Sequence, residues 1–198
     1  ERMGNLILMT PMLRALKRAL PWATLDCLAA PAYAALLEGN RWVSTVHLFD
    51  KRRPLALWRK SRTLRRLCYD VVIDAAHPET LSLTSAILAR ASHAPIAIRH
   101  AADGADLFFN VLVDRAEAAT HDIQVKLELL TPLGCTSSGL HMEPPSDFAP
   151  SPVSPRLAVH LGARKSANTI PPNLLRTLVD RARPTLPPLF IAGPAERD

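Results

Sequence analysis

Short apolar runs alternate with amphipathic stretches along this chain, and this alternation limits the possible fold more than any other feature. Strand-like runs lie at 24–29, 43–49, 70–75, 95–98, 107–113, 157–161 and 188–192. Helix-like stretches lie at 10–20, 33–38, 55–68, 79–91, 122–130 and 173–183. Strands that alternate with helices predict a parallel sheet covered on both faces, which is the doubly wound α/β class. In such sheets ligands bind at the carboxyl ends of the strands.

The first helix has two candidate starting points. Thr10 followed by Pro11 is typical of an N-cap and a proline in the first helical position, and a start nearer Gly4 also fits the pattern. Gly4 and Asn5, placed just before a helix, would leave backbone N–H groups available to an anion. A plain loop that caps a core helix is the alternative interpretation of the same two residues.

A proline-rich stretch marks the clearest domain boundary. Residues 141–156 have the sequence HMEPPSDFAPSPVSPR, with five prolines that stiffen the chain and remove backbone donors. We therefore predict an N-terminal Rossmann-like domain at 1–140, a linker at 141–156 and the start of a second β-α-β domain at 157–198.

Composition and motif searches exclude several classes of protein. The three cysteines lie far apart and are odd in number, which argues against a disulfide framework and for a reducing compartment. Glycine-rich dinucleotide and phosphate-loop motifs, the G-x-S-x-G hydrolase motif and zinc-ligand spacings do not occur. No apolar run reaches the roughly 18 residues of a membrane-spanning helix, and we expect no signal peptide.

The positive charge is concentrated in one segment. The net charge is +6, and eight of the 24 basic residues lie between Lys51 and Arg66 with no acid among them. A helix with leucines on one side and cations on the other could contact an anionic phospholipid or glycolipid surface. A solvated helix face whose leucines pack onto the sheet is the main alternative interpretation. Nucleic acid is the weakest of the three, since no reader motif is visible.

Two histidines follow predicted strands. His77 and Glu79 come after the run at 70–75, where either could act as a base, or where both could belong to a turn before the next helix. His160 has a similar position, with a donor contact and a structural hydrogen bond as alternatives. The cysteines Cys27, Cys68 and Cys135 are most simply small buried apolar groups.

Several segments together resemble one known family. Residues 2–21, RMGNLILMTPMLRALKRALP, resemble the signature R-x-G-D-x-[VIL]-L-x-T-P-x-L-R-A-L-K-x-x-x-P of the glycosyltransferase family nine proteins, the lipopolysaccharide heptosyltransferases. The other similar segments follow in the family's order: APAYAALLEGN at 30–40, YDVVID at 69–74, the helix at 122–134, VHLGA at 159–163 and GPAER at 193–197.

The resemblance implies a GT-B architecture, in which two Rossmann-like domains flank a cleft, and here the second would be incomplete. It also implies an inverting transfer that needs neither a metal nor a cofactor beyond an ADP-activated sugar donor. The implied acceptor-binding residues are Gly4 and Thr10, beside Asn5. The implied donor-binding residues are Gly162, Arg164, Lys165, Asn168, Gly193 and Glu196.

The chain departs from the family's pattern at important positions. The family's acidic base falls on Asn5, and an amide cannot accept a proton at neutral pH. The donor-side lysine falls on Asn168, and the proline of the H-P-G-A motif falls on Leu161. The family's first strand and its D-T-G-P-x-H segment do not occur in these 198 residues, so we expect a piece truncated at both ends that is inactive by itself.

The favoured function is therefore transfer of a sugar, heptose by resemblance, from an ADP-activated donor to a lipopolysaccharide core acceptor. We expect a cytoplasmic protein that is peripheral to the inner face of the bacterial inner membrane and binds no nucleic acid. The alternative is a non-catalytic glycan- or membrane-binding relative without the base. Another GT-B enzyme with a different acceptor is a third hypothesis.

Overall fold

The protein is described by a computed structural model that covers residues 3–116, 121–136, 139–143, 156–161, 169–182 and 185–191. It divides into two compact units, a first unit of residues 1–148 and a second unit of residues 149–198. The division falls inside the stretch 141–156 that the sequence predicts as a linker.

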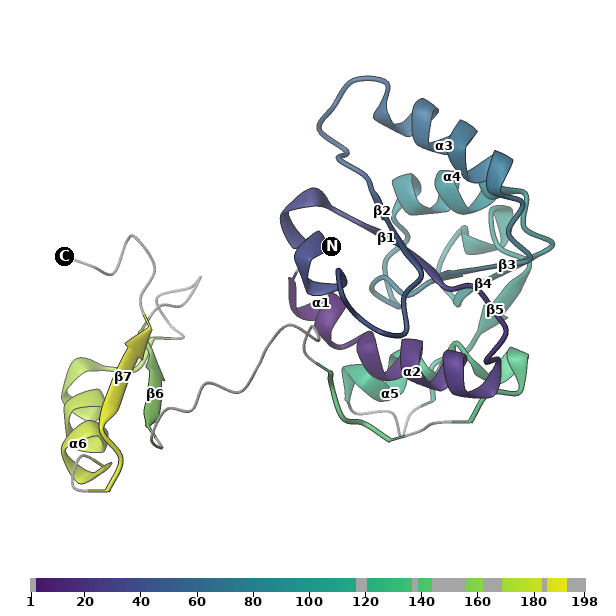
Figure 1. The fold of residues 1–198 in the computed structure, drawn as a ribbon. Helices are drawn as coiled ribbons and strands as arrows, with labels where there is room; N and C mark the ends of the chain where they lie inside the picture. Colours follow the sequence, from purple (N-terminus) through teal and green to yellow (C-terminus); the bar gives the residue numbers. More distant parts are fainter. Residues whose placement is uncertain are drawn as a thin grey trace. The chain divides into compact units, whose positions relative to one another are not determined.

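The first unit has alternating helices and strands (Figure 1). Its helices are α1 (Met3–Ile7), α2 (Thr10–Ala19), α3 (Ala56–Leu67), α4 (Leu83–Ser92) and α5 (Asp122–Glu128), with 3-10 turns η1 (Pro31–Leu36), η2 (Ala105–Leu107) and η3 (Thr131–Leu133). Its strands are β1 (Asp26–Ala29), β2 (Thr45–Leu48), β3 (Val71–Asp74), β4 (Ile96–His100) and β5 (Val111–Val113). The second unit contains β6 (Leu157–His160), α6 (Pro172–Ala182) and β7 (Pro188–Ile191).

All strand pairs among the described residues are parallel, as the alternation predicts. In the first unit they form two sheets, one with the order β1-β2 and one with the order β3-β4-β5, and in the second unit β6 pairs with β7. Tyr69, just before β3, connects the two sheets of the first unit because its hydroxyl donates to Asp26 Oδ2 of β1 at 2.7 Å. Burial and this carboxylate together raise the pKa of Tyr69.

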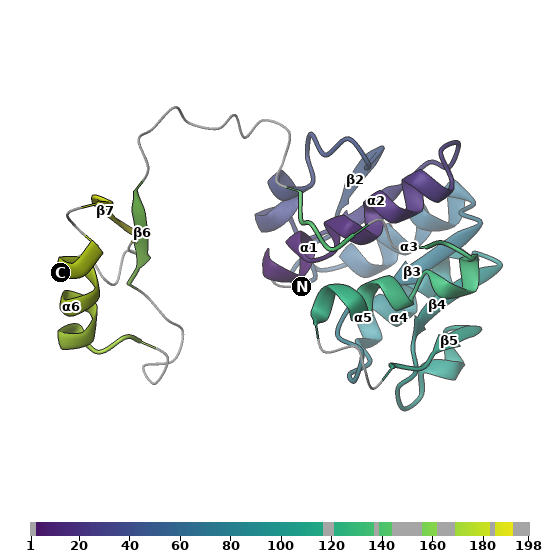
Figure 2. The same ribbon diagram turned by 90° about the horizontal axis from the view of Figure 1, so that it is seen from below.

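Helices cover both faces of the three-stranded sheet (Figures 1 and 2). On one face, apolar residues of α2 and the end of α5 pack with Ile98 of β4 around a cluster that includes Leu16 and Leu129. On the other face, Ala86 and Ala89 of α4 pack against β4. Ala97 and Ile98 are consecutive in β4 and face opposite helix layers, which explains why both are apolar and buried.

Three predicted elements differ from the structure in type, or by more than a residue or two at an end. The helix predicted at 79–91 begins at Leu83, because the Ser82 side chain caps it by accepting from Ser85 N. The strand predicted at 107–113 keeps only Val111–Val113, since Gly104 at φ 70° starts the turn η2 that takes up residues 105–107. The stretch predicted as a helix at 33–38 forms the 3-10 turn η1.

The beginning of α2 also corrects two predictions. Gly4 and Asn5 belong to the short helix α1 and do not form a loop before the first helix. Met9 is the N-cap of α2, so Thr10 is its first residue. Thr10 does not cap, because its hydroxyl donates back to Ile7 O at 2.8 Å.

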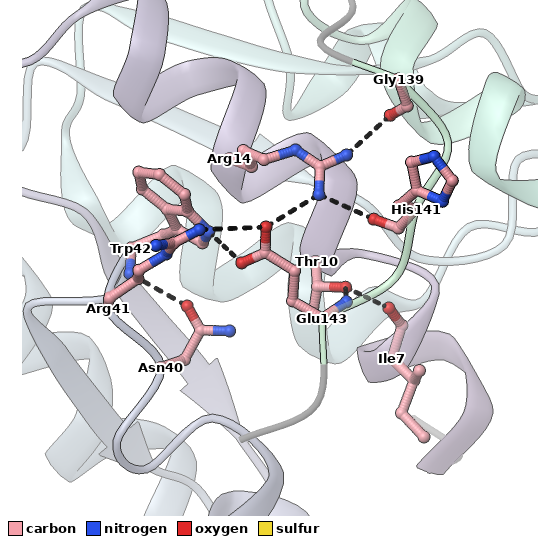
Figure 3. A network of polar contacts seen from close by, with 9 residues as sticks. All are labelled: Ile7, Thr10, Arg14, Asn40, Arg41, Trp42, Gly139, His141 and Glu143. Carbon is pink, nitrogen blue, oxygen red and sulfur yellow. Dashed lines mark hydrogen bonds and ion pairs between the residues drawn. The ribbon is translucent and has the colours of Figure 1, made fainter. Parts of the chain in front are cut away.

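A polar network holds residues 139–143 against α2 and the turn after η1 (Figure 3). Arg14 donates to Gly139 O at 2.9 Å, to His141 O at 2.8 Å and to Glu143 Oε1 at 2.8 Å. The Trp42 indole also donates to Glu143. The first three residues of the stretch predicted as a linker are therefore fixed on the first unit.

The network determines the ionisation of Glu143. Burial by itself would raise the pKa of this carboxyl, but the hydrogen bonds from Arg14 and Trp42 and the charge of Arg41 outweigh burial and lower it. The contribution of Glu143 to stability is therefore complete above its unfolded-state pKa. It is lost as the pH falls through the lower value of the folded state.

We predict that Arg14→Met lowers the free energy of unfolding by about 3 kcal/mol at pH 7, because it leaves Glu143 largely buried without its main partner. The difference between the wild type and the variant should shrink as the pH falls into the acidic range and Glu143 becomes protonated. Urea unfolding across this pH range measures both effects.

Arg53→Met is the matched control, because it removes an exposed ion pair to Asp50 at 3.6 Å. Its cost should be at most about 0.5 kcal/mol. Equal costs for the two arginine variants would contradict the role given to the Arg14 network.

Candidate functional site

A cavity of about 150 Å³ opens at the carboxyl ends of β3, β4 and β5, where parallel sheets usually bind ligands. We call it the carboxyl-end cavity. Five parts of the chain supply its walls: α1, the loop after β3, the end of β4, the end of β5, and α5. The lining residues are Asn5, Ala76, His77, Pro78, Glu79, His100, Arg115, Asp122, Val125, Lys126 and Leu129.

The cavity brings together two residues that the sequence singled out. Asn5 of α1 and His77 of the loop after β3 both line it, although 71 positions of sequence lie between them. Glu79, which the sequence suggested as an alternative base, is also in the lining. The structure therefore places the candidate catalytic positions at one site.

The two predicted acceptor-binding residues do not line this cavity. Gly4 is exposed, and a Cβ built on it meets no atom within 4 Å, so close packing does not require a glycine at this position. Thr10 is 1% exposed. Its hydroxyl donates to Ile7 O and accepts from Glu143 N at 3.0 Å, so it is engaged in holding the 139–143 segment (Figure 3).

The predicted donor-side positions cannot be placed. Gly162, Arg164, Lys165, Asn168, Gly193 and Glu196 all lie outside the described residues. His160 is the last residue of β6 and is exposed.

Two buried residues with nitrogen-containing side chains, His100 and Lys126, also line the cavity, and neither was predicted from the sequence. Lys126 of α5 is 7% exposed, and its ammonium donates to Ala75 O at 2.7 Å. His100, the last residue of β4, is 2% exposed, with Nε2 at 2.7 Å from Val125 O and Nδ1 at 3.2 Å from Val113 O. These bonds tie α5 to the sheet, which fixes the position of the helical wall.

Some signal for these two residues was present in the sequence. His100 follows the apolar run at 95–98, as expected for a residue at the carboxyl end of a strand. Lys126 lies in the predicted helix 122–130, where a lysine is more often exposed, so its burial depends on tertiary contacts that no local pattern shows.

The rim of the cavity has exposed charges. Arg115 Nη1 lies 3.0 Å from Glu79 Oε1, which joins the end of β5 to the loop after β3. His77 Nδ1 accepts from Glu79 N at 3.4 Å, so in the neutral ring the proton is on Nε2. Asp122, the first residue of α5, is a further exposed carboxylate in the lining.

Arg99 of β4 holds the loop after β3 through hydrogen bonds to its backbone. It is 1% exposed, and its Nη2 donates to His77 O and to Thr80 O, both at 3.3 Å. The guanidinium also lies 5.6 Å from the centre of the Phe109 ring. Arg99 thereby holds the backbone that carries His77 and Glu79.

A second hollow, of about 380 Å³, lies beside the basic segment. It is lined by Leu48 and Phe49 at the carboxyl end of β2 and by Arg53, Arg59 and Lys60 of the 51–66 segment, among others. Burial lowers the pKa of Lys60. The hollow therefore combines an apolar wall with a cationic one.

Two other kinds of site are absent from the described ranges. These ranges contain no group of three or more His, Cys, Asp or Glu side chains that could hold a metal ion. They also contain no helix that is long and apolar enough to span a membrane.

No protein-family model and no curated protein matches the chain. Solved structures do match it over nearly its whole length. A glycosyl transferase of family 9 from Veillonella parvula is 20% identical, with a TM-score of 0.79 over 100% of this chain and 61% of that one. E. coli heptosyltransferase WaaC, solved with ADP-2-deoxy-2-fluoro heptose, is 19% identical, with a TM-score of 0.73 over 99% of this chain and 68% of that one.

E. coli ADP-heptose LPS heptosyltransferase II is 16% identical, with a TM-score of 0.67 over 96% of this chain and 61% of that one. At these identities the likeness concerns the fold. The chain spans about 61% of the length of the family 9 structure, and over that span it has the predicted α/β fold of the GT-B heptosyltransferases.

Proposed function

We propose that this chain is part of a sugar-nucleotide-dependent glycosyltransferase and that its first unit binds the acceptor. The observation that carries the proposal is the carboxyl-end cavity, where Asn5, from the segment that resembles the family signature, meets the loop after β3. The fold shared with glycosyltransferases over the whole chain supports it. The alternative of a non-catalytic relative rests on the amide at position 5.

The proposed chemistry needs a group that takes a proton and groups that orient the acceptor. An acceptor hydroxyl attacks the anomeric carbon of the donor, and the diphosphate leaves from the opposite face. Asn5 can orient a hydroxyl through its amide but cannot deprotonate it. The exposed side chains of His77 and Arg115 at the rim supply further hydrogen-bonding groups for a saccharide.

The donor we propose is an ADP-activated heptose, and the acceptor a lipopolysaccharide core saccharide. Two of the similar structures, both of WaaC, were solved with ADP or an ADP-heptose analogue, and heptosyltransferase II is named for ADP-heptose and LPS. Residues 164–168 and 193–196 would line the donor side. The mechanism assigned by resemblance uses no metal.

We also propose that α3 contacts an anionic membrane or glycolipid surface on the cytoplasmic side of the inner membrane. Leu64 is the only residue of α3 that is buried, whereas Trp58 is 56% exposed and Leu67 is 44% exposed. Arg62 lies over Trp58 at 4.8 Å from the ring centre. Exposed apolar groups among cations favour a lipid interface over a helix face that only meets water.

The complete protein that contains this chain should transfer heptose from ADP-heptose to a deacylated lipopolysaccharide core. The measurement is ADP release together with the mass gain of the saccharide. A protein that binds the saccharide without transfer would be the non-catalytic relative, and one that binds neither the saccharide nor ADP would contradict the proposed function.

Replacing Arg62 and Arg66 by glutamine should weaken binding to vesicles of phosphatidylglycerol and phosphatidylcholine by about 30-fold, because each cation near an anionic surface contributes about 1 kcal/mol. Vesicle co-sedimentation at low salt measures this change. The matched control replaces Arg176 and Arg181, two exposed cations of α6, and should bind like the wild type. Equal binding by all three proteins would contradict the membrane contact.

A further inference from the structure

The proposed transfer needs a proton acceptor, and the carboxyl-end cavity offers few candidates. Asn5 is excluded, since a carboxamide is not a base at neutral pH. Lys126 is a buried cation that donates to Ala75 O. The side chains that remain are His77, Glu79, His100 and Asp122.

The His100 side chain has a structural role. Both of its ring nitrogens face backbone carbonyls, Val125 O at 2.7 Å and Val113 O at 3.2 Å. Carbonyl oxygens only accept hydrogen bonds, so neither nitrogen is available to take a proton from a ligand. At 2% exposure the ring also has almost no contact with solvent.

The two candidates of the loop after β3 are also engaged. Glu79 pairs with Arg115 at 3.0 Å, so its carboxylate already has a partner. Nδ1 of His77 accepts from Glu79 N, which leaves the protonated Nε2 as a donor. Both arrangements would have to break before either group could act as a base.

Asp122 differs from these three groups. It is the first residue of α5 and is exposed, and its carboxylate has no hydrogen bond or ion pair with another described side chain or backbone group. It lines the same cavity as Asn5, and α1 lies beside the beginning of α5 in both ribbon views (Figures 1 and 2).

The backbone at Asp122 is firmly placed. His121 caps α5 by accepting from Ile123 N at 3.1 Å, and the Gln124 side chain accepts from His121 N in return. Ile123 and Val125 are buried, and Lys126 ties the next turn to β3. A carboxylate on such a rigid helical position is well suited to catalysis.

We propose that Asp122 is the catalytic base of this site, an inference that rests on the proposed glycosyltransferase function. The acceptor O–H bond breaks, and its proton passes to a carboxylate oxygen of Asp122. The acceptor oxygen forms a bond to the anomeric carbon as the bond from that carbon to the diphosphate oxygen breaks. ADP leaves with that electron pair, so the step needs no other reactant.

The test uses the complete protein with ADP-heptose and a deacylated core saccharide, and follows kcat and KM separately. Asp122→Asn should lower kcat by at least about 100-fold, the usual lower bound for loss of a general base, with KM for ADP-heptose unchanged. Asp70→Asn is the matched control, an exposed aspartate beside the opposite, amino end of β3, and should retain wild-type kcat. Thermal unfolding confirms that both variants are folded.

A second variant separates catalysis from structure. Asn5→Asp places a carboxylate on the α1 wall of the same cavity, and in the Asp122→Asn background it should restore kcat at least about tenfold. A residue that only holds the helix in place would not be rescued in this way.

The outcomes distinguish the two proposals. If the wild type transfers heptose and Asp122→Asn does so equally well, Asp122 is not the base and the proposed function stands. If Glu79→Gln or His77→Gln abolishes transfer while Asp122→Asn does not, the base is in the loop after β3. If the wild type transfers no sugar, the proposed function is overturned, and the role of Asp122 with it.

Discussion

The double burial of β4 is the constraint on which the rest of the first unit depends. Within the described residues, β4 is the strand that has a parallel neighbour on each side, with β3 and β5 as its partners. Ala97 is 6% exposed on the face of α4, and Ile98 is 0% exposed on the face of α2 and α5. Removing either helix layer would expose the apolar side chain of Ala97 or of Ile98 to water.

The last two residues of β4, which lie at the cavity, also face opposite sides of the sheet. Arg99 and His100 follow Ile98 on opposite faces, and both are nearly inaccessible to solvent. Arg99 holds the loop after β3, and His100 holds α5 through Val125 O. Consecutive residues of β4 therefore position two walls of the carboxyl-end cavity, the loop after β3 and α5. Burying such polar groups has a cost in stability, and their hydrogen bonds to backbone carbonyls offset part of it.

Local patterns were enough to predict the order of the elements and the parallel pairing. The apolar runs at 70–75 and 95–98 became β3 and β4 because short apolar runs between helices have few other stable arrangements. The ends of other predicted strands were wrong. Phe108 and Phe109 favour a strand over 107–113, but Gly104 starts a 3-10 turn before them. Asn110 then accepts from Ala97 N of β4 through its side-chain oxygen.

The candidate site was only partly predictable, because it is assembled by tertiary contacts. Asn5 and His77 were found from a motif and from a position after a strand. Asp122 and Lys126 were not found, since a helix in sequence does not show which residues face a cavity. The surroundings of Thr10 also depend on tertiary contacts. Its partners, Ile7 O and Glu143 N, include one that is 133 positions away.

If the carboxyl-end cavity of the first unit holds the acceptor, hydrogen–deuterium exchange of the complete protein should change at its walls when a saturating core saccharide is added. We expect protection of the amides at 76–80 and 121–129, with little change in α3 or in the second unit. Protection confined to segments outside the cavity, with 76–80 and 121–129 unchanged, would contradict acceptor binding in this cavity.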